Sequence, residues 1–314
     1  MLKPASLHPG DTIGIVSLAS PPFRPSAVEE GKRNLEKMGF KVVLTPGIGD
    51  VNRYLAGSDQ ARLDAFHQLI ADPTVKAIMS TRGGYGSSRL LPKLDFDLLK
   101  KNPKIIIGYS DITSILTAVT RKLGLATFYG PMLTSDLTDS VSSYSTDFLM
   151  NLLCHRKCPL DITAYPDQSK AIVYHGGKAE GELIGGCLTL LTYTMGTPYE
   201  IDTRGRILFI EEIDEAPYKL DGMLTHLINA GKFQECAGVV FGELVDCNPR
   251  NSGYPMGSFH YEEVIQERLG NLGIPVIGNL CFGHGSHKAT LPLGIRASLD
   301  TAEAKLSIIE SAVE

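Results

Sequence analysis

The sequence predicts an α/β protein with a parallel sheet in its first half and a mixed, β-rich second half. Up to Gly124, apolar runs of strand length alternate with helical patterns. These runs are apolar on both faces, which is typical of a parallel sheet covered by helices on both sides. The apolar runs that close the chain are short and separated by turns, which favours a mixed sheet there.

Length, composition and net charge limit the classes of protein to which this chain can belong. The 314 residues suffice for one large α/β domain or two medium domains. Hydrophobic residues make up 43% and charged residues 21%, as in a folded enzyme. A net charge of −5 and the lack of any Lys/Arg run longer than a pair disfavour nucleic acid as a partner. Neither a signal-peptide pattern nor a membrane-length apolar run occurs, so we expect a cytoplasmic protein that binds no membrane and keeps its six cysteines reduced.

Strand and helix patterns follow one another in order through the first half. The expected strands are 12–16, 41–44, 75–79 and 105–107, and the expected helices are 26–38, a segment capped by Ser58, and 111–123. Gly39 and Gly124 end the first and the last of these helices. Ligands bind beyond the carboxyl ends of the strands in such a sheet, so we expect the site in the loops after Val16, Met79 and Ile107.

The chain divides where its composition changes. Residues 1–135 form the predicted N-terminal domain and residues 182–314 the predicted C-terminal domain. Residues 136–181 are polar and rich in Ser, Thr, Asp and Pro, and we interpret them as an irregular linker. In the second domain, the expected helices are 188–195 and 218–230, and the expected strands are 207–210, 238–241, 275–282, 293–299 and 305–309.

Ser110 is the candidate nucleophile. It lies between an apolar strand and an amphipathic helix, where a sharp turn holds a hydroxyl clear of the backbone. The positive end of the helix and the next backbone amide can stabilise an oxyanion at that place. The segment matches only half of the Gly-x-Ser-x-Gly pattern, because Ile112 stands where the second glycine belongs. A role of Ser110 as a simple helix cap stays open.

A glycine loop follows the strand that ends near Met79. Its residues Arg82–Gly86 include three glycines, which let backbone amides approach a ligand closely and cradle an anion or an oxyanion. The loop lacks the Gly-Lys-Ser/Thr ending of a phosphate-binding loop, and the dinucleotide pattern fails at Arg89. Nucleotide binding is therefore disfavoured, and a tight turn without a ligand is the alternative.

A nucleophilic serine needs a base, and the base needs an acid that orients it. His284 is the best candidate base, because it follows a strand and the flanking Gly283 and Gly285 free the backbone to aim the imidazole. Glu211 is the candidate acid, because it is the first polar residue at the carboxyl end of a buried strand. A salt bridge or a helix cap is the alternative role of Glu211.

Two patterns suggest a metal site. His284 and His287 have His-x-x-His spacing, and Cys154 and Cys158 enclose His155. No helix supports the histidine pair and no second Cys/His pair completes a four-ligand set, so we expect no metal.

Taken together, these segments resemble the LD-carboxypeptidase family of serine peptidases, which includes murein tetrapeptide carboxypeptidases and microcin-immunity peptidases. The resemblance covers nearly the whole chain in the family's order. It rests on the segments Gly10–Val16, Arg82–Gly86, Gly108–Thr113, Phe209–Glu212, Pro217–Tyr218, Asp221–Leu224, Gly283–Gly285 and Leu291–Gly294. Many relatives carry Arg in place of Gly222, and 246–258 looks like an extended loop; both departures bear on substrate recognition or the dimer contact.

The resemblance implies a catalytic triad and its fold. The triad is Ser110, Glu211 and His284, and the backbone amides of Gly84 and Asp111 form the oxyanion hole. The implied fold is a Rossmann-like N-terminal domain with a smaller β-rich C-terminal domain, usually in a homodimer with the site between the domains. No metal and no cofactor are implied.

The implied reaction is hydrolysis of the L,D-amide bond before a terminal D-amino acid, most often between diaminopimelate and D-alanine in a murein tetrapeptide. Two alternatives stay open. One is a microcin-immunity-type peptidase that cleaves an aminoacyl-nucleotide conjugate, and the other is a non-catalytic module that binds a nucleotide or a sugar through the glycine loop. The chain has no Trp, which removes one stacking platform for a nucleotide and favours the murein peptide.

Overall fold

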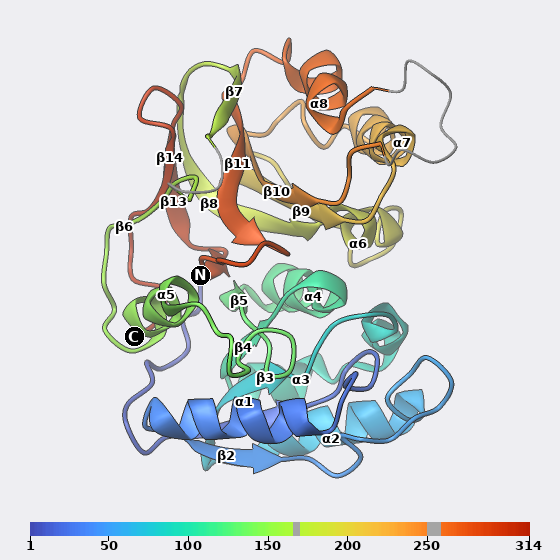
Figure 1. Ribbon diagram of the computed structural model, residues 1–314, viewed down its shortest axis with the longest axis vertical. Coiled ribbons are helices and arrows are strands. Elements are labelled where there is room, and N and C mark those ends of the chain that lie inside the picture. Colours follow the sequence, from blue (N-terminus) through green and yellow to red (C-terminus); the bar gives the residue numbers. More distant parts are fainter. Residues whose placement is uncertain (166–169, 250–258) are drawn as a thin grey trace.

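The fold consists of two β-sheets, one above the other in Figure 1, with helix α4 (Thr113–Leu123) between them. The structure is a computed structural model that describes residues 1–165, 170–249 and 259–314. The predicted class is confirmed: the N-terminal part contains a parallel sheet, and the second sheet is mixed.

The first sheet, within the described residues, has six strands in the order β12-β5-β4-β3-β1-β2. All pairs are parallel except β12 with β5. Because the carboxyl ends of parallel strands share one edge, the loops after β1, β3 and β4 meet there. The strands are β1 Thr12–Val16, β2 Lys41–Leu44, β3 Val75–Ser80, β4 Ile105–Gly108, β5 Thr127–Tyr129 and β12 Leu291–Leu293.

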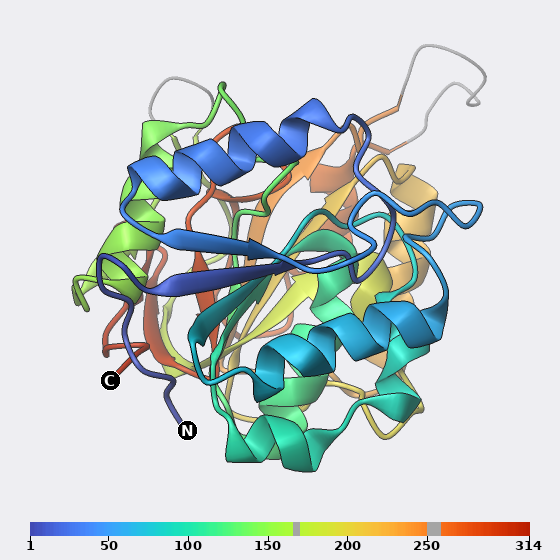
Figure 2. The same ribbon diagram turned by 90° about the horizontal axis from the view of Figure 1, so that it is seen from below.

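Helices cover both faces of this sheet, and Figure 2 shows α1 and α2 on opposite sides of it. Local chemistry sets their ends. Ser58 Oγ accepts a hydrogen bond from Ala61 N at 3.1 Å and begins α2. Gly39 after α1 and Gly124 after α4 have φ of 97° and 62°, which glycine adopts without strain. The helices here are α1 Ser26–Lys37, α2 Asp59–Ala71, η1 Ser87–Lys93, α3 Phe96–Lys101, η2 Ser110–Ile112 and α4.

The second sheet, as far as it is described, has eight strands in the order β6-β14-β13-β8-β9-β10-β11-β7. The central strands β8 to β11 are parallel, and the outer pairings are antiparallel. The strands are β6 Leu160–Ile162, β7 Ile172–His175, β8 Lys178–Cys187, β9 Ile207–Ile213, β10 Gly238–Val245, β11 Val276–Gly283, β13 Arg296–Asp300 and β14 Lys305–Ile308. The accompanying helices are α6 Leu188–Tyr193, α7 Pro217–Asn229 and α8 Tyr261–Leu269.

The segment 136–181 is more regular than the linker expected from its composition. It contains α5 (Ser143–Leu153), β6, β7 and the start of β8. The helix forms because Phe148 and Leu152 lie on one face and pack into the core, although polar residues surround them. The domain boundaries at 135 and 182 stay a prediction. The sequence-identified loop 246–258 lies largely outside the described residues.

One predicted strand is wrong. The chain over 293–299 forms parts of two strands, because Gly294, with φ of 83°, turns the backbone between β12 and β13. β13 stays in the second sheet, whereas β12 pairs with β5 and joins the first. The C-terminal part of the chain therefore completes the N-terminal sheet.

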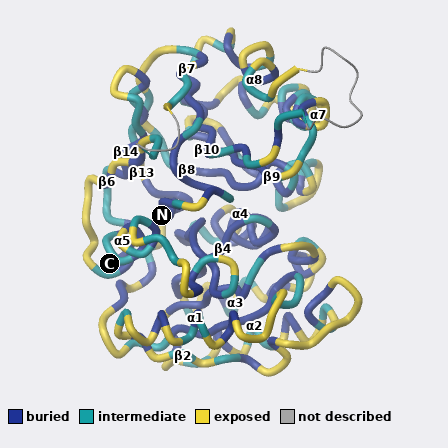
Figure 3. The backbone as a smooth tube through the Cα atoms, in the orientation of Figure 1, coloured by how far each residue is buried: buried dark blue, intermediate teal, exposed yellow. Residues whose placement is uncertain are grey.

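Burial places the N-terminus of α4 at the boundary between the two sheets. Figure 3 shows buried strands in both sheets, and Thr113–Thr120 of α4 are buried throughout. The segment that begins α4 is therefore fixed by both halves of the molecule. In the described part of the chain, no helix has the length and apolar character that crossing a membrane requires.

Candidate active site

Ser110 lies at a strained turn between β4 and α4. Its φ is 58°, a conformation that residues other than glycine rarely adopt. Two hydrogen bonds hold the backbone there: Thr113 Oγ1 donates to the Ser110 carbonyl at 2.6 Å, and Ser110 N donates to Tyr129 Oη at 3.1 Å. The N-cap residues of η2 and α4 are Tyr109 and Ile112, and neither helix has a side-chain capping hydrogen bond. The turn has the strained geometry of a nucleophile elbow, and the helix-cap alternative is not supported.

The glycine loop packs directly on this turn. A Cβ atom at Gly83 would lie 3.0 Å from Ser110 Oγ and 3.3 Å from Asp111 N. The Asp111 carboxylate fixes the loop, because it accepts hydrogen bonds from Gly86 N at 3.1 Å and Ser87 N at 2.8 Å. Gly84 has φ of 110°, and its amide makes no hydrogen bond to another described residue. A free amide therefore lies in the loop that covers Ser110.

Glu211 and His284 form a buried pair. Glu211 comes from β9 and His284 directly follows β11, and Glu211 Oε2 lies 2.6 Å from His284 Nδ1. A Cβ atom at Gly283 would lie 2.7 Å from the same carboxylate oxygen, so glycine there allows the close approach. Burial alone would lower the pKa of His284, but the charge and hydrogen bond of Glu211 outweigh it and raise that pKa above 6.5.

Tyr129 connects this pair to the serine turn. At the end of β5, its Oη donates to Glu211 Oε1 at 2.5 Å and accepts the hydrogen bond of Ser110 N. Burial and the adjacent Glu211 raise the pKa of Tyr129 well above its usual value, so the phenol keeps its proton. Tyr129 was not among the residues predicted from sequence. The available signal was a polar-tipped aromatic at the carboxyl end of a buried strand.

Tyr109 brings Ser110 and His284 into one neighbourhood. Its ring packs edge-on against the imidazole of His284, with 4.9 Å between the ring centres. Because Tyr109 directly precedes Ser110, the turn that carries the serine lies near the Glu211–His284 pair. The described chain shows no hydrogen bond from Ser110 Oγ to His284, and such bonds often tighten only when substrate binds.

A polar cavity of about 400 Å³ opens beside His284. Lys288 and Asp136 meet at its wall, with 3.0 Å between Nζ and Oδ1, and Lys288 also donates to the Gly285 carbonyl at 2.6 Å. The cavity therefore offers hydroxyls and a paired charge next to the imidazole. Its lining is Tyr109, Ser135, Asp136, Ser140, Ser142, Ser145, His284, Gly285, Ser286 and Lys288.

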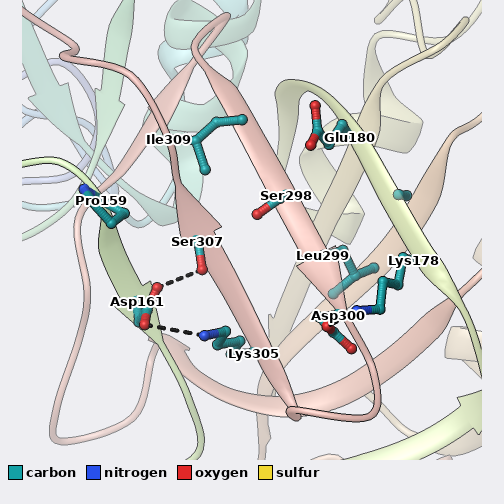
Figure 4. A pocket seen from close by; sticks show the side chains of 11 residues that line it. Pro159, Asp161, Lys178, Glu180, Ser298, Leu299, Asp300, Lys305, Ser307 and Ile309 are labelled. Carbon is teal, nitrogen blue, oxygen red and sulfur yellow. Dashed lines mark hydrogen bonds and ion pairs between the residues drawn. The ribbon is translucent and has the colours of Figure 1, made fainter.

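A larger hollow of about 550 Å³ lies on the outer strands of the second sheet (Figure 4). None of Ser110, Glu211 and His284 lines it. Its charged side chains are paired: Asp161 with Lys305 at 3.5 Å, Lys178 with Asp300 at 2.7 Å, and Glu180 with Arg296 outside the hollow at 3.0 Å. The smaller cavity at His284 is the better candidate, because it adjoins a buried acid–base pair.

The two suggested metal patterns have other contacts. His287 Nδ1 lies 2.5 Å from Ser142 Oγ, and its ring stacks on Tyr165 at 3.8 Å. Cys154 Sγ lies 3.7 Å from the sulfur of Met150. Within the described residues, no three His, Cys, Asp or Glu side chains gather as a metal site would require.

Two family models match the chain. The model of the LD-carboxypeptidase N-terminal domain matches residues 13–130, and that of the LD-carboxypeptidase C-terminal domain matches residues 180–299. A probable murein peptide carboxypeptidase of Bacillus subtilis is 39% identical and aligns over 99% of this chain and 95% of the relative. The microcin C7 self-immunity protein MccF of Escherichia coli is 30% identical over 98% of this chain and 96% of its own length.

Solved structures show the same arrangement of the whole chain. Wild-type MccF without ligand superposes with a TM-score of 0.88 at 31% identity and covers 100% of both chains. The muramoyltetrapeptide carboxypeptidase from Oxalobacter formigenes has a TM-score of 0.82 at 28% identity and covers 94% of this chain and 97% of its own.

Proposed function

Because this chain belongs to the LD-carboxypeptidase family, we propose that Ser110, His284 and Glu211 are the catalytic triad of a serine carboxypeptidase that acts on murein peptides. One observation carries the proposal: a buried carboxylate holds the imidazole at 2.6 Å, and that imidazole packs on the residue before Ser110.

In the proposed acylation step, His284 takes the proton of Ser110 Oγ while that oxygen attacks the carbonyl carbon of the L,D-amide bond. Glu211 accepts a hydrogen bond from Nδ1–H, which leaves Nε2 as the base. The amides of Gly84 and Asp111 stabilise the oxyanion. The unpaired Gly84 amide and the contact between the loop and Ser110 support this role.

His284 then gives its proton to the nitrogen of the terminal D-amino acid, and the carbon–nitrogen bond breaks. The peptide remains on Ser110 as an ester. His284 next takes a proton from water, whose oxygen attacks the ester carbonyl, and the proton returns to Ser110 Oγ. The products are a shortened peptide and a free D-amino acid.

The proposed substrate is the murein tetrapeptide that ends in diaminopimelyl-D-alanine. The test is to incubate the purified protein with this tetrapeptide and, separately, with an aminoacyl-nucleotide conjugate. We expect D-alanine from the tetrapeptide. Cleavage of the conjugate alone would assign the protein to the immunity branch, to which MccF belongs by name. Binding of either compound without cleavage would favour the non-catalytic module.

We further propose that the protein works in the cytoplasm as a homodimer, as the family resemblance implies. Support comes from the substrate class, because short murein peptides are soluble fragments. Sedimentation equilibrium at several protein concentrations tests the dimer, and cell fractionation tests the location. A monomer at all concentrations, or recovery outside the cytoplasm, would contradict these two proposals.

A further inference from the structure

A carboxypeptidase has to recognise the free carboxylate at the end of its substrate. In an L,D-peptide, only the amide nitrogen and one α-carbon separate that carboxylate from the scissile carbonyl. Its partner must therefore lie next to the nucleophile. Removing a carboxylate from water is costly unless a cation and hydrogen-bond donors meet it, so a charged side chain is the expected partner.

Among the described residues, three cations near the site are Arg62, Lys288 and Arg82. Arg62 contacts the glycine loop and is paired with Asp59 at 2.6 Å. Lys288, beside His284, is already compensated, because its Nζ lies 3.0 Å from Asp136 and donates to a backbone carbonyl. Arg82 begins the glycine loop. Within the described ranges, its guanidinium contacts the Pro21 carbonyl and the Phe23 ring and forms no ion pair with a carboxylate. Arg82 therefore has a positive charge that the free protein leaves unmatched.

Two neighbours of the Arg82 guanidinium remove it partly from water. Its Cζ lies 3.4 Å above the ring centre of Phe23, and Nη1 lies 3.4 Å from the Pro21 carbonyl. Arg82 is partly buried, and burial lowers its pKa from the usual value. A partly desolvated guanidinium without an anion gains more from binding one than a solvated guanidinium does.

The position of Arg82 suits the substrate terminus. The next residue, Gly83, touches Ser110, and Arg82 Nη2 lies 3.5 Å from where a Cβ atom of Gly84 would be. The guanidinium is thus beside the amide proposed to hold the oxyanion. Both Pro21 and Arg82 belong to loops at the carboxyl ends of β1 and β3, the edge where ligands bind in such sheets.

We propose that Arg82 binds the terminal carboxylate of the peptide substrate and thereby makes the enzyme a carboxypeptidase rather than an endopeptidase. This inference rests on the proposed function. The planar guanidinium forms paired hydrogen bonds with a carboxylate, while the face of the guanidinium packs on the ring of Phe23. Arg82 is then a specificity residue, and Ser110 and His284 perform the chemistry.

The test compares two peptides, the tetrapeptide with a free terminal carboxylate and the same peptide with a terminal amide. We expect R82Q to lower kcat/KM for the free acid about thirtyfold and to change it less than threefold for the amide. R82K should retain part of the preference for the free-acid peptide, because lysine keeps the positive charge but lacks the paired N–H donors of the guanidinium. R33Q is the control, since Arg33 is an exposed arginine with a carboxylate partner, Asp139, at 3.6 Å.

A binding measurement separates recognition from turnover. In the S110A background, calorimetry should show weaker binding of the free-acid peptide when R82Q is added, and no change for the amide. Equal losses on both peptides, or no loss on either, would overturn the role of Arg82 and leave the triad untouched. A wild-type protein that cleaves neither peptide and is not labelled by a fluorophosphonate would overturn the proposed function, and the Arg82 inference with it.

Discussion

The phenol of Tyr129 donates a hydrogen bond to the carboxylate of Glu211 at 2.5 Å, and it does so across the boundary between the two sheets. The same phenolic oxygen accepts the backbone N–H of Ser110 at 3.1 Å. One buried side chain therefore positions the turn of the candidate nucleophile relative to the candidate acid. A shift of Ser110 or Glu211 away from this phenol breaks that residue's hydrogen bond to Tyr129.

Tyr129→Phe should keep the fold and reduce turnover. The change removes the donor to a fully buried oxygen of Glu211, which costs about 1–3 kcal/mol of stability. It also frees the Ser110 backbone, so we expect kcat to fall roughly tenfold or more while KM changes little. Thermal unfolding and steady-state kinetics measure both effects. Tyr174→Phe, a buried tyrosine on β7, is the control, and equal kinetic effects of the two variants would refute a positioning role.

The activity should depend on the pKa of His284, which Glu211 raises above 6.5. Catalysis requires neutral imidazole, so kcat/KM should rise with pH, with its acid-side midpoint above 6.5. Glu211→Gln should lower both that midpoint and kcat. The contribution of the His284–Glu211 pair to the free energy of unfolding has the opposite pH dependence. It is complete below pH 6.5 and is lost as the pH rises through the raised pKa of His284. An unshifted midpoint in Glu211→Gln would contradict the coupling.

Gly83→Ala should impair activity more than stability. The added methyl would lie 2.9 Å from Ser110 Cβ and 3.0 Å from Oγ, so the nucleophile must move. Small displacements of a reacting group can cost about a hundredfold in rate, and we expect at least a tenfold loss of kcat. Gly49→Ala is the matched control, because no atom lies within 4 Å of the added carbon. Wild-type kinetics in Gly83→Ala would exclude close contact between the loop and Ser110.

The enzyme should discriminate between diastereomeric tetrapeptides. Inverting the terminal alanine exchanges the positions of its methyl and carboxylate groups, so the carboxylate no longer reaches its partner. A hundredfold preference for D-alanine requires about 2.7 kcal/mol in the transition state. Quantifying the released alanine from the two peptides tests this expectation. Equal rates would mean that the site does not read the configuration of the leaving residue.

Much of the fold could be predicted because local signals decide it. Ser58 caps α2, and Gly39 and Gly124 stand in left-handed conformations where their helices end. Other features depend on contacts distant in sequence. The crossing of β12 to the first sheet depends on pairing Leu291–Leu293 with β5, and the apolar face of α5 lies in a segment that is polar on average. Periodicity alone does not show such partners.

The same distinction holds for the site. Ser110 and His284 lie just after strands, with recognisable flanking residues, whereas Glu211 lies within β9, which continues to Ile213. The structure brings Glu211 and His284 into contact. Tyr129 was not predicted, because its role depends on two hydrogen bonds to residues of other elements, Ser110 in η2 and Glu211 in β9. Arg82 was part of a noted loop, but that no acidic side chain of the described residues pairs with it becomes visible only in three dimensions.

The most direct test of the central claim is to measure covalent labelling and D-alanine release in the wild type and in Ser110→Ala. Alanine keeps the Cβ atom and the same backbone, and Ser110 is the N-cap residue of neither η2 nor α4, so the variant should fold with nearly unchanged stability. We predict a fluorophosphonate adduct on the Ser110 peptide of the wild type only, and at least a thousandfold loss of release in the variant. Release of D-alanine by Ser110→Ala at the wild-type rate would contradict the account.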